Sequence, residues 1–159
     1  MTEVPDAGHH TPDANAFVAL LETISNDALA DEWIGLYAPD ATVEWIVDGS
    51  VARYHGIDEI GPAVEELTTL WRALHLRVRT TVACSDATTV ALTYTGGFDG
   101  KVNQRGAEIW TFRDQRVVRH QMFAYLNVLP EDSFLGRLRV AAMSPRVAFT
   151  VLTQRTISS

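Results

Sequence analysis

Residues 105–128 contain one carboxylate and one imidazole that could together do acid–base chemistry. β-Branched and aromatic residues dominate two arms of this segment, and the polar quartet 113–116 separates the arms, so the pattern predicts two long strands joined by a tight turn. Strand alternation sets Glu108 and His120 each among apolar neighbours on one face. Those neighbours are Trp110, Phe112, Val118, Met122, Ala124 and Leu126.

The length of the turn decides whether the two groups meet. With a two-residue loop, Glu108 lies opposite Gln121, and with a three-residue loop it lies opposite His120. The longer loop favours glycine at its last position, where this chain has Gln115. Spacing alone therefore leaves both registers open.

A glutamate on an apolar wall has its charged form disfavoured, and a histidine beside it can share or orient the proton. Such a pair suits general acid and base catalysis, and protonated Glu108 could donate to a substrate carbonyl. The reactions within reach are proton abstraction next to a carbonyl, aldol-type cyclisation, double-bond migration and loss of water. The structural alternative is an ion pair of Glu108 with Arg105, Arg119 or His120 at the rim of the sheet.

The composition indicates one domain that binds neither nucleic acid nor membrane. The chain has 159 residues, 47% of them hydrophobic, which is enough to bury a core. A formal charge of -7 opposes phosphate binding, and no apolar run approaches the roughly 20 residues of a membrane span. With the single cysteine Cys84 and no charged-then-apolar leader, we expect a cytoplasmic protein.

No cofactor or metal is predicted. The glycine-rich stretch 96–104 lacks the Lys-Ser/Thr ending of a phosphate-binding loop and does not open a helix. His75, Glu108 and His120 do not form a local ligand motif. Any catalysis must therefore use the acids and bases of the chain itself.

Periodicity predicts the elements that must position these groups. Helical spacing indicates a first helix capped by Thr11, with Phe17, Leu20, Leu21 and Ile24 in one stripe. A short second helix follows Asn26 or Asp27 and ends before Pro39, and residues 60–74 form a long amphipathic helix. Strands are expected at 43–47, 53–54, 75–84 and 89–95.

The segments LYAPDATVEW, YHGIDEI and EIWTFRDQRVVRHQMF resemble, in sequence and spacing, the NTF2-like superfamily, in particular its SnoaL-like and ketosteroid-isomerase-like branches. The resemblance covers about residues 14–128. It implies an α+β cone, in which a curved, mostly antiparallel β-sheet packs on about three N-terminal helices around a ligand pocket. The expected domain plan is a flexible arm (1–10), a SnoaL-like domain (11–128) and a C-terminal extension (129–159) that caps the pocket or forms a dimer arm.

The resemblance also assigns positions in the pocket. The isomerase base falls at Trp45 and the oxyanion-hole tyrosine at Leu21, which argues against steroid isomerisation by that mechanism. The second oxyanion-hole acid falls at Glu108, which keeps its carboxyl group, and the same alignment favours the three-residue turn. The pocket-facing positions include His120, Met122 and Ala124.

For three residues the sequence leaves two interpretations of the side-chain location open. By the resemblance, Trp45 is a flat platform in the pocket, and Tyr37 reaches the pocket from behind. The alternatives are a core tryptophan and a buried ring whose hydroxyl is bonded to backbone. His75 points into the pocket, as in dehydratase-like relatives, or lies on a solvated polar strand face.

The first functional hypothesis is a cofactor-free SnoaL-like enzyme, a cyclase, isomerase or dehydratase, acting on a small hydrophobic polycyclic or carbonyl compound. Its predicted catalytic residues are Glu108, His120 and His75. Its predicted substrate contacts are Tyr37, Trp45, Trp110, Met122 and Ala124. The alternative is a non-catalytic NTF2-like ligand-binding or assembly module. Either protein is expected to form a homodimer through the outer sheet face that carries Phe123 and Tyr125.

Overall fold

The computed structural model describes residues 12–129 and residue 142. The chain divides into two units, Met1–Leu126 and Asn127–Ser159. The predicted arm (1–10) lies outside the described residues, as does the predicted extension except for residues 129 and 142. All the elements below belong to the first unit.

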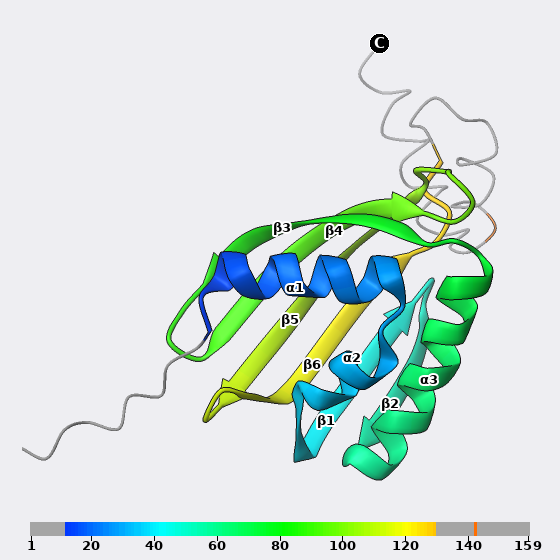
Figure 1. The fold of residues 1–159 in the computed structure, drawn as a ribbon. Helices are drawn as coiled ribbons and strands as arrows, with labels where there is room; N and C mark the ends of the chain where they lie inside the picture. Colours follow the sequence, from blue (N-terminus) through cyan, green and yellow to red (C-terminus); the bar gives the residue numbers. More distant parts are fainter. Residues whose placement is uncertain (1–11, 130–141, 143–159) are drawn as a thin grey trace, which may run out of the picture. The chain divides into compact units, whose positions relative to one another are not determined.

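Three helices lie on one face of a six-stranded sheet (Figure 1). The helices are α1 (Ala14–Asp27), α2 (Ala30–Gly35) and α3 (Ile57–Ala73). The strands are β1 (Tyr37–Val47), β2 (Ser50–His55), β3 (Arg77–Ser85), β4 (Thr89–Gly97), β5 (Gln104–Arg113) and β6 (Arg116–Tyr125). In the part of the chain that the structure describes, no helix has the length and apolar character needed to cross a membrane.

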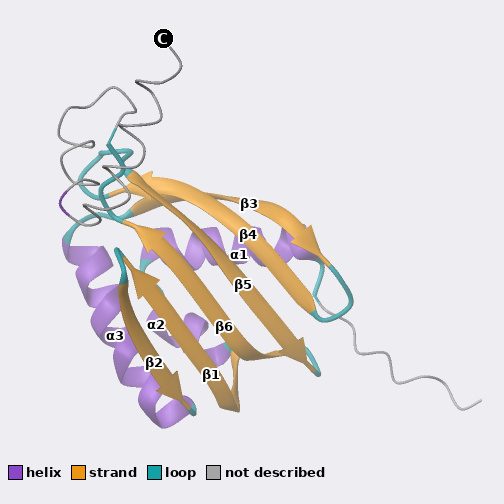
Figure 2. Ribbon diagram, turned by 180° about the vertical axis from the view of Figure 1, so that it is seen from behind, coloured by secondary structure: helices purple, strands orange, loops and turns teal. Residues whose placement is uncertain are grey.

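The strand order is β2-β1-β6-β5-β4-β3, and all neighbouring pairs are antiparallel except β1 with β6. The predicted curved, mostly antiparallel sheet is therefore confirmed. The other face of the sheet carries no helix among the described residues (Figure 2). On that face Tyr125 is 61% exposed, and a homodimer through this surface stays a prediction.

Helix α1 is fixed to the edge strand β3 by side-chain hydrogen bonds. The Asn26 amide bonds both the N–H and the C=O of Val78, at 2.7 and 3.0 Å. The helix is capped two residues later than predicted, by Asp13 in place of Thr11, because the Asp13 carboxylate accepts from the N–H of Ala16. The buried stripe of the helix consists of Phe17, Val18, Leu21 and Ile24.

Strand β1 begins six residues earlier than the predicted 43–47 segment. Pro39 has no N–H for a ladder, and it lies between Tyr37 and Thr42, where the pairing with β6 is interrupted. Tyr37 itself is paired with Val117 and is 2% exposed. The early start therefore brings Tyr37 into the core beside the end of β6.

The turn between β5 and β6 has a two-residue loop followed by a bulge. Asp114 and Gln115 have φ values of 50° and 63°, and positive φ at both central residues is the requirement of a type I′ hairpin turn. The ladder pairs Phe112 with Val117 and then skips Val118. Strand alternation had predicted that Val118 faces inward. Because of the bulge, Val117 faces inward instead and is fully buried.

The bulge changes which residues face one another across the hairpin. Trp110 lies opposite His120, and Glu108 lies opposite Met122. Neither predicted register is correct, because one set Glu108 opposite Gln121 and the other set it opposite His120. The extra residue in β6 shifts the pairing by one position and leaves Glu108 diagonal to His120 on the inner face.

Gly106 on β5 tests how tightly the inner face of the sheet is packed. An added Cβ would lie 2.4 Å from the ring and hydroxyl of Tyr94, its pairing partner on β4. We expect Gly106→Ala to lower the free energy of unfolding by about 1–3 kcal/mol in urea titrations, because the tyrosine must move. In the control Gly35→Ala the new Cβ has nothing within 4 Å. Equal losses in the two variants would contradict the packing described.

Candidate active site

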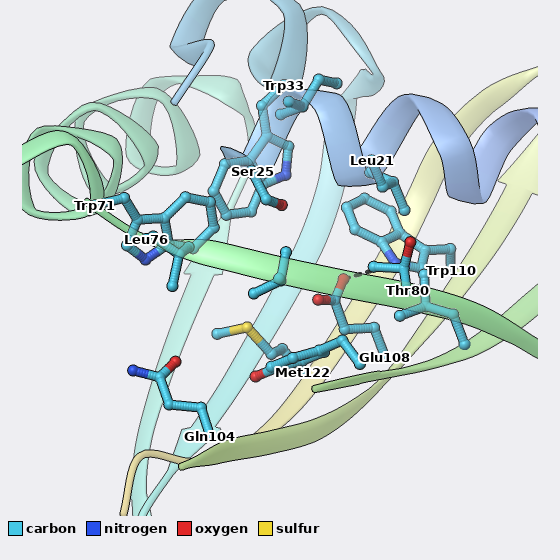
Figure 3. Close-up of a pocket in the computed structure, with 14 residues that line it drawn as sticks. Leu21, Ser25, Trp33, Trp71, Leu76, Thr80, Gln104, Glu108, Trp110 and Met122 are labelled. Atoms are coloured by element: carbon cyan, nitrogen blue, oxygen red, sulfur yellow. Dashed lines mark hydrogen bonds between the residues drawn. The ribbon is translucent and has the colours of Figure 1, made fainter. Parts of the chain in front are cut away.

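A cavity of about 40 Å³ lies between the helices and the inner face of the sheet (Figure 3). Its walls come from all three helices and from β3 to β6. The apolar lining includes Trp33, Trp71, Leu92, Trp110 and Met122. The polar lining consists of Ser25, Thr80, Tyr94, Gln104 and Glu108. A mainly apolar cavity with a few polar groups is typical of small-molecule sites.

The structure brings three of the predicted site residues to this cavity, namely Glu108, Trp110 and Met122. The predicted contacts Tyr37 and Ala124 are instead buried behind its wall. Trp45 is also absent from the lining, and its ring packs against Trp33 and Tyr54 at centroid distances of 5.9 and 5.2 Å. Of its two interpretations, the core tryptophan is the one observed.

His75 lies away from the cavity. Its side chain is 76% exposed, and its Nδ1 atom is 3.1 Å from the carboxylate of Asp99. The residue has a positive φ of 50° between α3 and β3, and the strand begins only at Arg77. Strand alternation cannot be counted from His75, because this residue precedes the strand. Its side chain lies in solvent and not in the pocket.

Tyr37 connects a tryptophan to the buried histidine. The Nε1–H of Trp33 donates to the Tyr37 hydroxyl at 3.0 Å, and this hydroxyl lies 2.7 Å from Nδ1 of His120. Burial raises the pKa of Tyr37 well above its usual value, so the hydroxyl keeps its proton. The hydroxyl has no other acceptor among the described residues, so we infer that it donates to Nδ1. With Nδ1 as the acceptor, Nε2 is the ring nitrogen that carries a proton.

Glu108 receives two hydrogen bonds on the same oxygen. Nε2 of His120 lies 3.2 Å from Oε2. Nε1–H of Trp110 donates to the same oxygen at 2.9 Å (Figure 3). Oε1 makes no hydrogen bond to the described residues, and the side chain is 16% exposed where it lines the cavity. Oε1 is therefore the atom that can take up or deliver a proton in the cavity.

His120 is held rigidly behind this carboxylate. It is fully buried, and its ring stacks on Trp110 with a centroid distance of 3.6 Å and an angle of 14°. It is not among the residues that line this cavity, and it contacts Glu108, which is. His120 is therefore connected to the cavity through its hydrogen bond with Glu108.

Tyr94 is a further polar group of the cavity. Burial, and then the negative charge of Glu108, raise the pKa of Tyr94, so its hydroxyl remains a donor. Sequence analysis placed Gln104 in the glycine-rich stretch 96–104 and gave no pocket role to Tyr94, Trp33 or Trp71, all of which line the cavity. Within residues 12–129, no three His, Cys, Asp or Glu side chains are grouped so as to hold a metal ion.

Comparison with known proteins identifies the family. Residues 14–120 match the model of the SnoaL-like domain. The chain belongs to the SnoaL-like family. A SnoaL-like protein of unknown function from Burkholderia thailandensis is 22% identical, with a TM-score of 0.56 over 70% of this chain and 92% of that chain. A provisionally named isomerase from Bacillus subtilis is 21% identical, with a TM-score of 0.56 over 70% of this chain and 85% of that chain.

A third structural neighbour is a provisionally named polyketide cyclase from Sinorhizobium meliloti. It is 20% identical, with a TM-score of 0.50 over 67% of this chain and 93% of that chain. At these identities the similarity shows the fold, which is the NTF2-like cone expected from the resemblance. The comparison with curated proteins found no match.

Tyr37→Phe removes the hydroxyl that joins Trp33 to His120. We expect the free energy of unfolding to fall by about 1–3 kcal/mol in urea titrations, because a buried donor and a buried acceptor both lose their partner. Tyr54→Phe is the matched control, since the Tyr54 hydroxyl makes no hydrogen bond to the described residues and its ring packs on Trp45. The control should change by less than about 0.5 kcal/mol. A similar loss in both variants would show that the Tyr37 hydroxyl is not a structural link.

Proposed function

We propose that this SnoaL-like protein is a cofactor-free acid–base catalyst that acts on a small hydrophobic carbonyl compound. Glu108 exchanges a proton with the substrate, and His120, Tyr37 and Trp33 hold it in position. The observation that carries the proposal is the unequal use of the two carboxylate oxygens. Oε2 accepts two N–H bonds, whereas Oε1 makes none with the described residues, and the side chain lines an apolar cavity.

The proposed step is proton abstraction from a carbon next to a carbonyl. The C–H bond breaks, its proton moves to Oε1 of Glu108, and the electron pair moves through the carbon skeleton to the carbonyl oxygen, giving an enolate. Return of the proton to another carbon completes an isomerisation. In a cyclisation the enolate attacks a second carbonyl carbon, and the alkoxide that forms takes the proton from Glu108. In a dehydration the hydroxyl on the neighbouring carbon takes that proton and leaves as water while the C=C bond forms. A single positioned carboxyl group serves all three outcomes.

The size of the cavity favours a small carbonyl compound over a polycyclic one. Ligand pockets usually measure about 300–1,000 Å³, and a cavity that holds benzene measures about 150 Å³. The cavity of about 40 Å³ is smaller than either, so even a single ring requires a wall side chain to move. Trp71 stacks on Trp33 at a centroid distance of 4.9 Å, and like Tyr94 it is an aromatic wall residue that is only partly buried.

The names of two structural neighbours, an isomerase and a polyketide cyclase, fall among the reactions proposed. At about one fifth sequence identity these names support the direction of the proposal and do not identify the substrate.

Glu108→Gln tests the proposal through hydrogen exchange. The native protein is expected to accelerate the exchange of the α-hydrogens of cyclopentanone in D₂O near neutral pH, followed by proton NMR. Glu108→Gln should slow the protein-dependent rate by about 10²–10⁴-fold, because the amide cannot accept the proton. Glu65→Gln removes an exposed carboxylate on α3 and should leave the rate unchanged.

Two outcomes would contradict this proposal. One is the absence of any acceleration by the native protein, and the other is an equal rate for the native protein and Glu108→Gln. Either would favour a non-catalytic ligand-binding module instead.

A further inference from the structure

The cavity contains a buried amide that the proposed proton transfer does not use. Gln104, the first residue of β5, is 5% exposed and lines the cavity. Its amide nitrogen is fully buried and has no hydrogen-bond partner among the described residues. A buried N–H group without a hydrogen-bond acceptor destabilises a folded protein. An unpaired N–H group at a cavity can instead donate to an acceptor atom of a bound ligand.

A second donor lies next to this amide along the sheet. Gln104, Gly106 and Glu108 alternate toward the inner face of β5, and the Cα atoms of Gln104 and Glu108 are about 13 Å apart. Gly106 has no side chain, and the ring of Tyr94 fills its place, since a Cβ there would lie 2.4 Å from that ring. Tyr94 therefore lies between Gln104 and Glu108, and its hydroxyl makes no hydrogen bond to the described residues.

The polar groups of the cavity are complementary in hydrogen-bonding character. The amide nitrogen of Gln104 and the protonated hydroxyl of Tyr94 are donors, whereas Oε1 of Glu108 is an acceptor. A carbonyl compound requires this combination, because its oxygen accepts hydrogen bonds and the carbon beside it gives up a proton. Leu21, where the family resemblance placed a donor, is aliphatic, so a donor to the substrate has to come from another element.

We propose that Gln104 and Tyr94 form an oxygen-binding subsite, which holds the carbonyl oxygen of the substrate and turns the neighbouring carbon toward Glu108. The proposal rests on the proposed function and specifies its substrate class as compounds with an acceptor oxygen directly beside the reacting carbon. As the proton leaves, negative charge develops on this oxygen, and the same two donors stabilise it. Figure 3 shows Gln104 and Glu108 reaching the cavity from the same strand.

The test compares two ligands of nearly the same shape, cyclopentanone and methylenecyclopentane, in which a CH₂ group replaces the oxygen. Each is titrated into ¹⁵N-labelled protein and followed by NMR. The ketone should bind roughly tenfold more tightly than the alkene, which is the effect of about one hydrogen bond, and it should shift the side-chain amide signal of Gln104. Gln104→Leu and Tyr94→Phe should each reduce ketone affinity severalfold, toward that of the alkene.

Gln121→Leu is the matched control, because Gln121 is bonded to Glu44 and does not line the cavity. This variant should keep the preference for the ketone. Gln104→Leu should keep or raise the melting temperature, since it removes an unpaired buried donor, and this measurement separates lost recognition from lost folding. Equal affinities of the native protein for the two ligands, or no saturable binding of the ketone, would overturn the subsite. A preference that persists in both Gln104→Leu and Tyr94→Phe would also overturn it.

Binding and exchange distinguish this proposal from the one on which it rests. Glu108→Gln should keep the preference for the ketone while losing α-hydrogen exchange. If the preference depends on Gln104 but exchange survives in Glu108→Gln, the subsite stands and the catalytic proposal fails. If exchange depends on Glu108 but native binding ignores the oxygen, the subsite fails and the catalytic proposal stands.

Discussion

Two N–H bonds to one oxygen of Glu108 are the constraint on which the inner face of this protein depends. A buried polar group is costly when it lacks a partner. From Trp33 through Tyr37 and His120 to Glu108, each ring N–H or hydroxyl finds an acceptor, and Trp110 completes the series. Both N–H donors at the end of this series bond Oε2 of Glu108, which leaves Oε1 as the carboxylate oxygen that can interact with a ligand.

This series requires elements that are far apart in the sequence. Tyr37 and His120 are separated by 83 residues, and the parallel pairing of β1 with β6 brings them together. The bulge at Val118 then places His120 opposite Trp110, so that the two rings stack and both reach Glu108. The strand register of the curved sheet sets the positions of the polar side chains. The helices contribute apolar side chains to the opposite wall of the cavity.

Much of this arrangement could be predicted from local sequence patterns. Helical and strand periodicity located the elements, and the facing carboxylate and imidazole were identified because both interrupt apolar alternation. The register was not predictable, since the bulge depends on how the type I′ turn fits the twist of the strands. The side-chain partners of Tyr37 were not predicted, because the second helix was expected to continue to Pro39, whereas Tyr37 is the first residue of β1. Gln104 was missed because an isolated polar residue after a glycine-rich stretch carries no periodic signal.

The tautomer of His120 tests the central claim most directly. In protein labelled with ¹⁵N-histidine, NMR distinguishes protonated from unprotonated ring nitrogens, and loss of one signal set in His120→Asn assigns them. Near neutral pH, the hydrogen-bond series predicts an unprotonated Nδ1, facing Tyr37, and a protonated Nε2, facing Glu108. A proton on Nδ1, in either the other neutral tautomer or the imidazolium ion, would contradict the direction of the series and with it the orientation of Glu108.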